Sequence, residues 1–495
     1  MKNKKNVIIV SMLVLVAVMA IGYSYFATRL NINATGNITT NWNVYFSNIT
    51  NGTVVGSASN NKTPSVTATT ATMDVNLSLP GDSITYELTL TNGGTIGAII
   101  EDIKAETKGS SAIIYSISGI KIGDKLASGA NKKITIKIEY DPNTTSQPAV
   151  TNKTLTVIID AVQDIGQSIN SSDIVIEEKT LAARILKENA PQSDSAIDFS
   201  KSSKEDGTKG LYYTNVNTEN NKTTYYFRGN VENNYVSFAS DSEGNEIIWR
   251  IVRINEDGSI RLIKETNAGS SPFNDNYVNT DVGFMYGTTG ASSYALTHEN
   301  TNDSIIKDAL DTWYTSNLSN YSNYLADAGF CNDRSIAPSA NTWNSSDTAL
   351  GYGRNKTYYG PYNRIENLNQ PQFACPQTND LFTLKGSNKG NKALDNPIGL
   401  LTADEVVYAG GKRYESNEDY YLANGVVWWT MSPRYFVGDY AYVWSVDAAG
   451  DASHGIADDE GGVRPVINLK SNVEFTLEGT GTPGSSTNPY TIKVN

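Results

Sequence analysis

The sequence predicts a multi-domain protein: an N-terminal hydrophobic helix, then an all-β sandwich, then a larger α+β domain. Three observations point to this organisation. At 495 residues, the chain exceeds what one hydrophobic core usually supports, so two or three domains are expected. Its first half contains short segments in which apolar and polar residues alternate, and Gly, Pro, Asn and Asp lie at their ends, a pattern that predicts β-strands. Its second half contains similar segments, together with stretches whose apolar residues recur at helical spacing and loops rich in aromatic residues.

Composition and charge narrow the class of protein. The formal net charge is −13, and only 18% of the residues are charged. Nucleic-acid binding needs a clustered basic face, and the sequence shows none, so no nucleic-acid partner is expected. The 29 tyrosines are typical of β-rich extracellular proteins, because aromatic side chains favour strands.

Residues 1–28 are predicted to be a signal peptide or a signal-anchor helix. Lysines precede an almost unbroken apolar run, Val7–Ile21. We therefore expect export, to the extracellular face of the cell membrane or into the medium. The small residues around Ile21 favour cleavage, whereas Tyr23 and Phe26 favour a retained anchor that would hold the protein at the membrane. The sequence leaves both open.

Residues 29–165 are predicted to form the β-sandwich. Met73–Leu79 and Ser83–Leu90 alternate cleanly, and the Pro-Gly-Asp turn between them predicts that they pair as a hairpin. Further strands are expected at Asn41–Phe46, Ile113–Ile117, Lys133–Tyr140 and Thr154–Ile159. The stretch LSLPGDSITYELTLTNGGTIGAI, residues 77–99, resembles the exported camelysin and biofilm-fibre-subunit group, and more loosely the immunoglobulin-like spacers of surface proteins. This resemblance implies a fibre subunit or a stalk.

Residues 166–210 are predicted to be a helix followed by a flexible linker. Asp173 can cap a helix whose apolar stripe includes Leu181 and Ile185 and which ends before Pro191. The following segment, 191–208, is poor in apolar residues, so we expect it to be exposed and mobile.

Residues 211–495 are predicted to form the α+β domain. An Asp-Gly turn joins Ile247–Ile254 to Ser259–Ile263 as a hairpin. Asn302 can cap a helix with apolar residues at helical spacing over 305–313. A capping box at Thr402–Glu405 predicts a second helix.

The stretch Gly425–Leu469 places many aromatic rings beside a loop rich in carboxylates, which predicts a binding face. Successive strand residues point to opposite faces, so at most one of Trp428 and Trp429 is expected in the core. The exposed rings are expected to be the other tryptophan, Tyr435, Phe436 and Tyr440. The predicted ligand-binding residues are Trp428, Trp429, Tyr435, Tyr440, Asp447 and Asp451. Trp249, Trp313 and Trp444 are expected in the core.

Several motifs in this half carry a resemblance: WWTMSP (428–433), WSVDAAG (444–450), GGVRPVINL (461–469), FCNDRS (330–335) and PIGLLTADE (397–405). They resemble an uncharacterised C-terminal domain family of Gram-positive bacterial surface proteins. That family is distantly similar to the C-type-lectin-like fold of formylglycine-generating enzymes and of the variable receptor-binding proteins of diversity-generating retroelements. The resemblance implies a scaffold with variable loops, which by itself specifies no function.

The two cysteines, Cys331 and Cys375, are predicted to form a disulfide, since an isolated pair in an exported chain is most simply bridged. The alternative is a catalytic thiol, which would need His298 or His454 as its base. Formylglycine-generating enzymes carry their reactive cysteines near the C-terminal Gly-x-Arg segment. No cysteine follows Cys375 here, so the resemblance does not imply oxidase activity.

No cofactor is expected, and calcium is the only metal with candidates. Asp458, Asp459 and Glu460, together with Asp447 and Asp451, could supply hard oxygen ligands, although they follow no recognised calcium-loop spacing. The alternative is a solvated acidic loop. Arg434 and Arg464 are candidate ion-pair partners for these carboxylates or candidate binding residues.

Together these observations predict an exported, non-catalytic ligand-binding or adhesion protein, with a β-sandwich stalk and a head that binds a surface glycan or a protein. A structural subunit of a surface or biofilm fibre is the main alternative. A hydrolase that uses Cys331 or Cys375 with His454 is the third.

Overall fold

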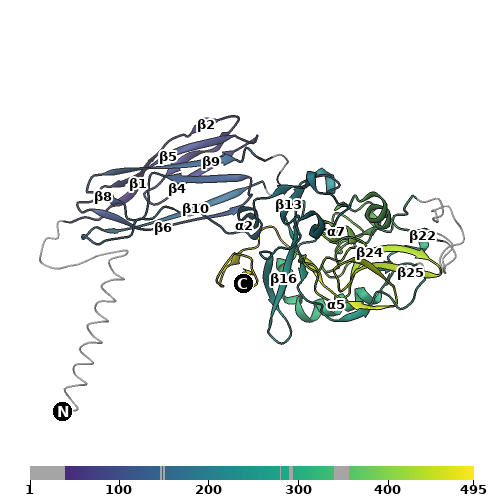
Figure 1. Ribbon diagram of the computed structural model, residues 1–495. Coiled ribbons are helices and arrows are strands. Elements are labelled where there is room, and N and C mark those ends of the chain that lie inside the picture. The colour runs from purple at the N-terminus through teal and green to yellow at the C-terminus, as the bar shows by residue number, and fades with distance from the viewer. Residues whose placement is uncertain are drawn as a thin grey trace, which may run out of the picture. The chain divides into compact units, whose positions relative to one another are not determined.

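The computed structural model describes residues 40–494 except 145–147, 149–150, 175, 279, 289–293 and 339–355. The predicted leader, residues 1–28, lies outside the described part. Within that part the protein is mostly β, with antiparallel and mixed sheets and short helices, and no helix is long and apolar enough to cross a membrane. The chain divides into two compact units (Figure 1). The first comprises residues up to 106, 113–143 and 155–177, and the second comprises 107–112, 144–154 and 178–495.

The first unit is built around two sheets and a separate hairpin. One sheet has the order β1-β5-β9-β7 with β2 on β5, and the other has the order β10-β6-β11 with β8 on β6. The strands of these sheets are β1 (Val44–Ile49), β2 (Thr53–Val55), β5 (Ser83–Asn92), β6 (Ala98–Gly109), β7 (Ile113–Ser118), β8 (Lys125–Leu126), β9 (Asn131–Tyr140), β10 (Lys153–Gln163) and β11 (Ile176–Glu178). The two sheets share one core, which includes Leu88, Ile100 and Ile134 and against which Val157 packs.

The turn at Pro80 does not join two paired strands, so the predicted hairpin is wrong. β4 (Ala71–Asn76) pairs with β3 (Ser59–Val66), whereas β5 pairs with β1, β2 and β9. The carboxylate of Asp82 accepts hydrogen bonds from the backbone N–H groups of Ser57, Ser78 and Leu79, each at 2.8 Å. These bonds wrap the turn around Asp82 and direct β5 away from β4.

The second unit contains two larger sheets, one of nine strands and one of six. The nine-stranded sheet has the order β12-β13-β14-β16-β15-β30-β29, with β17 between β16 and β28. Its strands are β12 (Gln192–Ser193), β13 (Gly210–Thr214), β14 (Thr224–Arg228), β15 (Tyr235–Ser240), β16 (Glu246–Ile254), β17 (Ile260–Lys264), β28 (Val466–Leu469), β29 (Phe475–Thr476) and β30 (Tyr490–Ile492). The predicted hairpin of 247–254 and 259–263 is confirmed as β16–β17.

The six-stranded sheet has the order β18-β27-β24-β25-β26, with β22 on β24. Its strands are β18 (Ser270–Pro272), β22 (Thr357–Tyr358), β24 (Trp428–Val437), β25 (Tyr440–Val446), β26 (Ala452–Ile456) and β27 (Glu460–Gly462). Two short ladders complete the unit: β19 (Met285–Tyr286) with β20 (Asn302–Asp303), and β21 (Phe330–Cys331) with β23 (Leu381–Phe382). The α-helices are α2 (Leu181–Glu188), α3 (Ser203–Asp206), α4 (Tyr294–Thr297), α5 (Ile305–Asn317), α6 (Gly360–Tyr362) and α7 (Ala403–Ala409).

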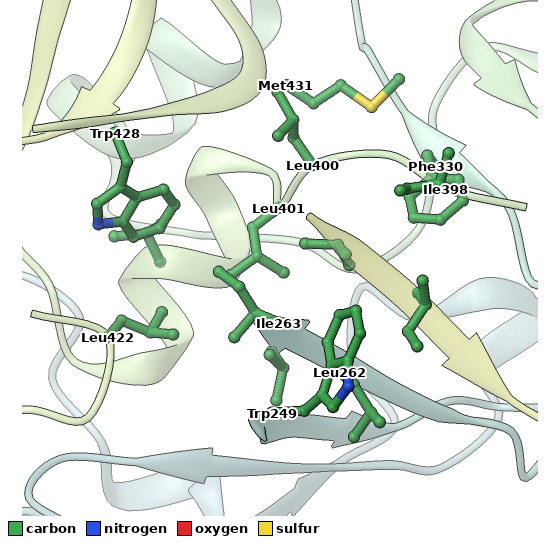
Figure 2. Close-up of a cluster of buried hydrophobic side chains, with 14 of the residues drawn as sticks. Trp249, Leu262, Ile263, Phe330, Ile398, Leu400, Leu401, Leu422, Trp428 and Met431 are labelled. Carbon is green, nitrogen blue, oxygen red and sulfur yellow. The ribbon is translucent and has the colours of Figure 1, made fainter. Parts of the chain in front are cut away.

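One continuous hydrophobic core joins both sheets of the second unit (Figure 2). Trp249 of β16 and Leu262 of β17 lie in the same cluster as Trp428 of β24. Leu400 and Leu401, from the loop before α7, fill the space between the sheets in Figure 2, and each side chain is fully buried. Burying one leucine or isoleucine contributes about 1.5–3 kcal/mol, so this cluster holds the two sheets together.

The three predicted helices of this unit are present, with two differences in capping. The N-cap of α2 is Thr180 rather than the predicted Asp173. Thr402 and Glu405 form the predicted capping box of α7, which ends at Gly410 with a φ of 116°. The cap of α5 is Ser304, whose hydroxyl accepts the backbone N–H of Lys307, rather than the predicted Asn302. Asn302 is paired in β20 and cannot begin the helix.

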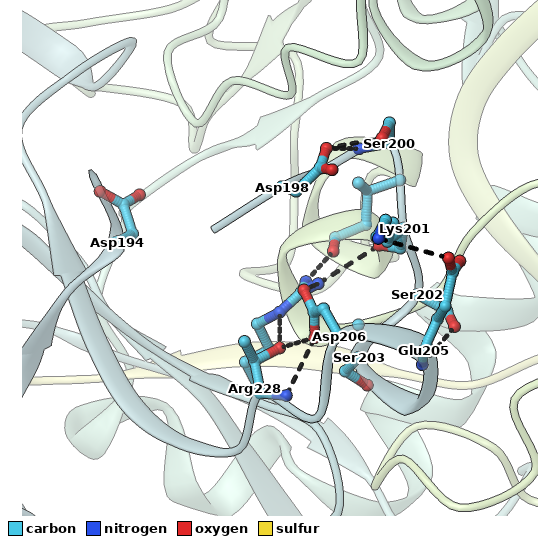
Figure 3. Close-up of polar contacts among 12 residues, drawn as sticks. Asp194, Asp198, Ser200, Lys201, Ser202, Ser203, Glu205, Asp206 and Arg228 are labelled. Atoms are coloured by element: carbon cyan, nitrogen blue, oxygen red, sulfur yellow. Dashed lines mark hydrogen bonds and ion pairs between the residues drawn. The ribbon is translucent and has the colours of Figure 1, made fainter. Parts of the chain in front are cut away.

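The segment predicted to be a mobile linker, 191–208, is instead fixed to the second unit (Figure 3). β12 pairs in parallel with β13, and the fully buried Arg228 reaches into the segment. Its Nε donates to the hydroxyl of Thr208 at 2.6 Å, and its Nη2 lies 3.2 Å from the carboxylate of Asp206. A buried guanidinium needs partners for its donors, and this segment supplies them. A segment poor in apolar residues is thus held by polar contacts.

Candidate functional site

Strands β24, β25 and β26 bring a row of aromatic rings onto one sheet surface. Tyr440 and Tyr442 are two residues apart on β25, so both point to the same face. Tyr435 of β24 pairs with Tyr442, and their ring centroids lie 4.9 Å apart. His454 of β26 lies 5.3 Å from the Tyr442 ring. Antiparallel pairing therefore assembles the row from three strands.

The row continues onto residues distant in sequence. Tyr358 of β22 lies 5.6 Å from Tyr435, and Tyr362 of α6 lies 4.6 Å from Tyr358. At the other end, Tyr277 lies 5.2 Å from Tyr440. We call this surface the tyrosine face; it comprises Tyr277, Tyr358, Tyr362, Tyr435, Tyr440, Tyr442 and His454. Tyr277 and Tyr440 are 44% and 42% exposed, so one end of the row is open to solvent.

A hollow lies beside the opposite end of the row. Its volume is about 210 Å³, and Tyr358, Tyr362, Lys356, Asn363 and Asn367 are among its lining residues. The ammonium of Lys356 lies 5.0 Å from the centre of the Tyr358 ring. The two amides offer donors and acceptors beside flat rings, a combination that suits a polyhydroxylated ligand.

Two guanidinium groups and two carboxylates brace the tyrosine face. Arg434 lies over the rings of Tyr435 and Trp444, at 4.4 and 5.0 Å, and forms an ion pair with Glu366. Arg413 lies 3.6 Å from both Glu366 and Asp451. These four charges cancel one another, so the two arginines add no net charge to the face. Arg434 and Arg464 were candidate ion-pair partners for the acidic loop, and neither pairs with it. Arg434 pairs with Glu366 instead.

Arg464 has a different role. Its fully buried guanidinium donates to the backbone carbonyls of Lys264, Leu422 and Glu265 at 2.6–3.0 Å. It also lies over the ring of Trp428 at 5.1 Å. It therefore ties the end of β17 and the segment at Leu422 to its own backbone inside the core rather than pairing with the acidic loop.

His454 is neutral in this setting. Arg413 can only donate, so its contact with Nδ1 at 3.2 Å makes Nδ1 an acceptor and places the ring proton on Nε2, 3.4 Å from the Tyr435 hydroxyl. Burial, together with the positive charges of Arg434 and Arg413, lowers the pKa of His454 to about 3. A histidine held neutral by two guanidiniums is a poor general base at neutral pH, because it binds a proton only weakly.

We expect His454 to make the folded state less stable in acid. The ring has a pKa of about 6.5 when unfolded and about 3 when folded, so between these values the unfolded state binds more protons. Stability is therefore lost as pH falls through this window. In His454→Gln, the drop in Tm between about pH 7 and pH 4.5 should be smaller than in the wild type, as measured by thermal unfolding. An equal drop in both proteins would contradict the assigned protonation state.

The expectation that one of Trp428 and Trp429 is exposed is wrong, because both faces of β24 are covered. Trp428 lies under Arg464, and its ring is 0% exposed. Trp429 is 1% exposed; it packs against Phe273 and donates its indole N–H to the carbonyl of Ser271 at 3.0 Å. Gly455 and Gly461 allow the Trp429 ring to approach the backbone, since a Cβ at either position would lie 2.5–2.6 Å from it.

Of the other predicted rings, Phe436 is also buried, at 1% exposure, whereas Tyr435 and Tyr440 belong to the tyrosine face. Trp249 and Trp444 lie in the core as expected, and Trp313 packs against it while only partly buried.

The predicted acidic residues lie in two separate turns. Asp447 accepts the backbone N–H groups of Ala449 and Asp451, and Asp451 accepts that of Tyr414. Asp459 accepts the N–H of Ile456 in the turn after β26.

The length of β26 separates these turns, a distance of roughly 13–17 Å over five residues, so the weak calcium candidates Asp458, Asp459 and Glu460 cannot share an ion with Asp447 and Asp451. Within the described residues, no group of three or more His, Cys, Asp or Glu side chains could hold a metal ion.

The predicted disulfide between Cys331 and Cys375 is confirmed, and it closes a sequence separation of 44 residues. Disulfides persist in oxidising compartments, so the bridge is typical of an extracytoplasmic protein. Both cysteines of the chain are in the bridge, which leaves the cysteine-hydrolase alternative without a thiolate. His298, the other candidate base, is buried and lies 6.3 Å from the Tyr359 ring.

Sequence reasoning missed five members of the tyrosine face, among them His454, which it considered only as a catalytic base. Tyr442 could have been found, since it alternates with Tyr440 on the same strand. Tyr277, Tyr358 and Tyr362 come from segments far from β25 and carry no local signal.

No protein-family model and no curated protein matches the sequence. Among solved structures, the secreted serine protease VesC from Vibrio cholerae aligns with 41% of this chain and 36% of its own length, at 12% identity and a TM-score of 0.13. A TM-score this low carries no argument about fold or function.

Proposed function

We propose that this protein is an exported, non-catalytic surface protein that binds an uncharged glycan through the tyrosine face. In this proposal the first unit is an immunoglobulin-like β-sandwich that serves as a stalk. The second unit is a C-type-lectin-like head, similar to the uncharacterised domain family of Gram-positive surface proteins. The observation that carries the binding role is the continuous row of six tyrosine rings and one imidazole on β22, α6, β24, β25, β26 and the loop at Tyr277.

The chemistry of the row favours a sugar over a charged partner. A tyrosine ring offers a flat apolar surface for stacking, and its hydroxyl offers a hydrogen bond, so the residue matches the two kinds of surface on a pyranose. The ion pairs of Arg413 and Arg434 cancel the charges of these arginines, and the ammonium of Lys356 lies at one end of the face. An anionic polymer or a basic peptide needs several complementary charges and would find few of them there.

The rings are also held in place before a ligand arrives. Arg434 lies over Tyr435, and the Tyr435 hydroxyl contacts His454, so the central ring is held from two sides. Preorganised rings lose little conformational entropy on binding, which raises affinity without new contacts. This rigidity supports a binding role.

Export rests on two features of different kinds. The leader at residues 1–28 is basic and then apolar, and a bridge such as Cys331–Cys375 is typical of proteins in an oxidising compartment. A leader that is retained would hold the protein at the membrane, whereas one that is removed would release it.

Tyr440→Ala is expected to weaken glycan binding about tenfold, whereas Tyr440→Phe should bind within about twofold of the wild type, because phenylalanine keeps the stacking surface. Tyr440 is 42% exposed, so neither change should disturb the fold. The full chain would first be screened on a glycan array, and isothermal titration would then measure Kd for the best neutral oligosaccharide.

Equal affinity of wild type and Tyr440→Ala, or selective binding of acidic glycans only, would contradict the proposal. Concentration-dependent assembly of the full chain without glycan binding would instead indicate a structural subunit of a surface fibre.

A further inference from the structure

A cavity of about 460 Å³ lies beside the disulfide, and none of its lining residues belongs to the tyrosine face. Segments from five parts of the second unit meet there: η2 (Glu219–Asn221), the β16–β17 hairpin, the two cysteines, the loop at Lys389 and the start of α7. The volume lies within the range of small-molecule sites, which is about 300–1,000 Å³.

At the floor of the cavity, two buried arginines lie against two buried glutamates, so that their charges cancel. The Nε atoms of Arg253 and Arg261 lie 3.1 and 2.8 Å from the same carboxylate oxygen of Glu405. The Nη1 of Arg253 also lies 3.2 Å from Glu256. Burial lowers the pKa of Arg261 to about 10, so its side chain stays charged at neutral pH. Two guanidiniums and two carboxylates thus cancel, and the floor is neutral but strongly polar.

Arg253 keeps donors free for a ligand. Its Nε and Nη1 are used by Glu405 and Glu256, whereas its Nη2 makes no hydrogen bond to any described residue. The guanidinium lies 4.6 Å from the centre of the Phe373 ring, which fixes its plane. Held in this way, the Nη2 group can donate its N–H groups to a ligand carboxylate.

The cavity also offers free groups of both signs near its rim. The ammonium of Lys389 and the carboxylate of Glu219 both line the cavity. Neither has an ion-pair partner in the described part of the chain. The exposed Asp257 adds a second carboxylate, whose Oδ1 accepts the backbone N–H and the hydroxyl of Ser259 and whose Oδ2 has no such bond to a described residue. Phe373 and the Cys331–Cys375 bridge add apolar surface to the wall of the cavity.

We propose that this cavity binds a small zwitterion: an amino acid or short peptide with a free ammonium and a free carboxylate. The ligand carboxylate lies against Nη2 of Arg253 and the ammonium of Lys389. The ligand ammonium lies against Glu219 and Asp257, and an apolar side chain packs on Phe373 and the disulfide. This site is independent of glycan binding by the tyrosine face.

The test uses the full chain and the dipeptide alanyl-phenylalanine in three forms: with both termini free, N-acetylated, and C-amidated. Isothermal titration should show saturable binding of the free dipeptide, and each blocked form should bind at least about tenfold more weakly, because it loses one charged contact. The dipeptide should also slow the reduction of Cys331–Cys375 by dithiothreitol, since the bridge forms part of the cavity wall.

Two variants assign the contacts. Lys389→Gln should weaken the free dipeptide and leave the C-amide unchanged, whereas Glu219→Gln should weaken the free dipeptide and leave the N-acetyl form unchanged. Both side chains lack ion-pair partners within the described residues, so the fold should tolerate either change. The proposal is overturned if the blocked forms bind as tightly as the free one, if one terminus alone accounts for binding, or if no saturation occurs at millimolar dipeptide.

Discussion

Replacing Cys331 and Cys375 together with serine is expected to lower the free energy of unfolding by about 4 kcal/mol. The bridge closes a sequence separation of 44 residues, and the chain-entropy model gives about this value for a loop of that length. The open chain gains conformations when it unfolds, so most of the loss arises in the unfolded state. The bridge also joins the FCNDRS segment to the loop before η5 (Thr378–Asp380), which positions part of the cavity wall.

Urea unfolding followed by tryptophan fluorescence would measure this change, because Trp249, Trp428, Trp429 and Trp444 are all buried in the second unit. The wild type kept in reductant should behave like the double variant, which provides a matched control without a mutation. Unchanged stability in both would mean that strain in the folded state cancels the entropy of closure.

Arg334→Ala is expected to cost about 3–5 kcal/mol, the range for breaking a buried ion pair by removing one partner. Arg334 and Asp380 are 0% and 1% exposed. The Nε of Arg334 donates to Oδ1 of Asp380 at 2.9 Å, and its own backbone N–H donates to Oδ2 at 2.6 Å. Its Nη1 and Nη2 donate to Met285 and Asn300. Alanine would leave the carboxylate of Asp380 charged, buried and unpaired.

The matched double variant Arg334→Met with Asp380→Asn should recover at least about 1 kcal/mol of this loss, because it removes the orphaned charge and keeps an acceptor for the Arg334 backbone N–H. Lys385→Ala provides the exposed control. Lys385 and Asp395 have side chains 70% and 60% exposed, so their ion pair should contribute no more than about 1 kcal/mol. If Arg334→Ala and Lys385→Ala had equal effects in urea unfolding, the buried pair would not have the role assigned to it.

Local patterns predicted the elements whose formation depends on neighbouring residues. The capping box of α7 and the β16–β17 hairpin are present as the sequence indicates. The pairing of strands was less predictable. Met73–Leu79 and Ser83–Leu90 have the alternation and turn of a hairpin, yet the hydrogen bonds of Asp82 direct the second strand to other partners. The alternation of apolar and polar residues predicts which side chains of a strand share a face. It does not predict which other strand pairs with it.

In the candidate site too, the sequence predicted some features, whereas others depend on contacts between distant segments. The sequence indicated aromatic rings on 428–444, and Tyr435 and Tyr440 do lie on the tyrosine face. Trp428 and Trp429 do not, because a layer covers each side of β24. Tyr358 joins the face from a strand more than seventy residues away, through pairing that no local pattern encodes.

Residue types and short-range spacing were enough to predict the β-rich character of the chain, the capping box of α7, the β16–β17 hairpin and the disulfide. These features depend on residue type, on spacing within a few positions, or on there being only two cysteines to pair. The exposure of individual rings, the cancellation of charges and the cavity beside the bridge follow from the packing of the folded protein. Exposure and charge balance depend on contacts between segments far apart in the chain, and those contacts exist only once the sheets have packed together.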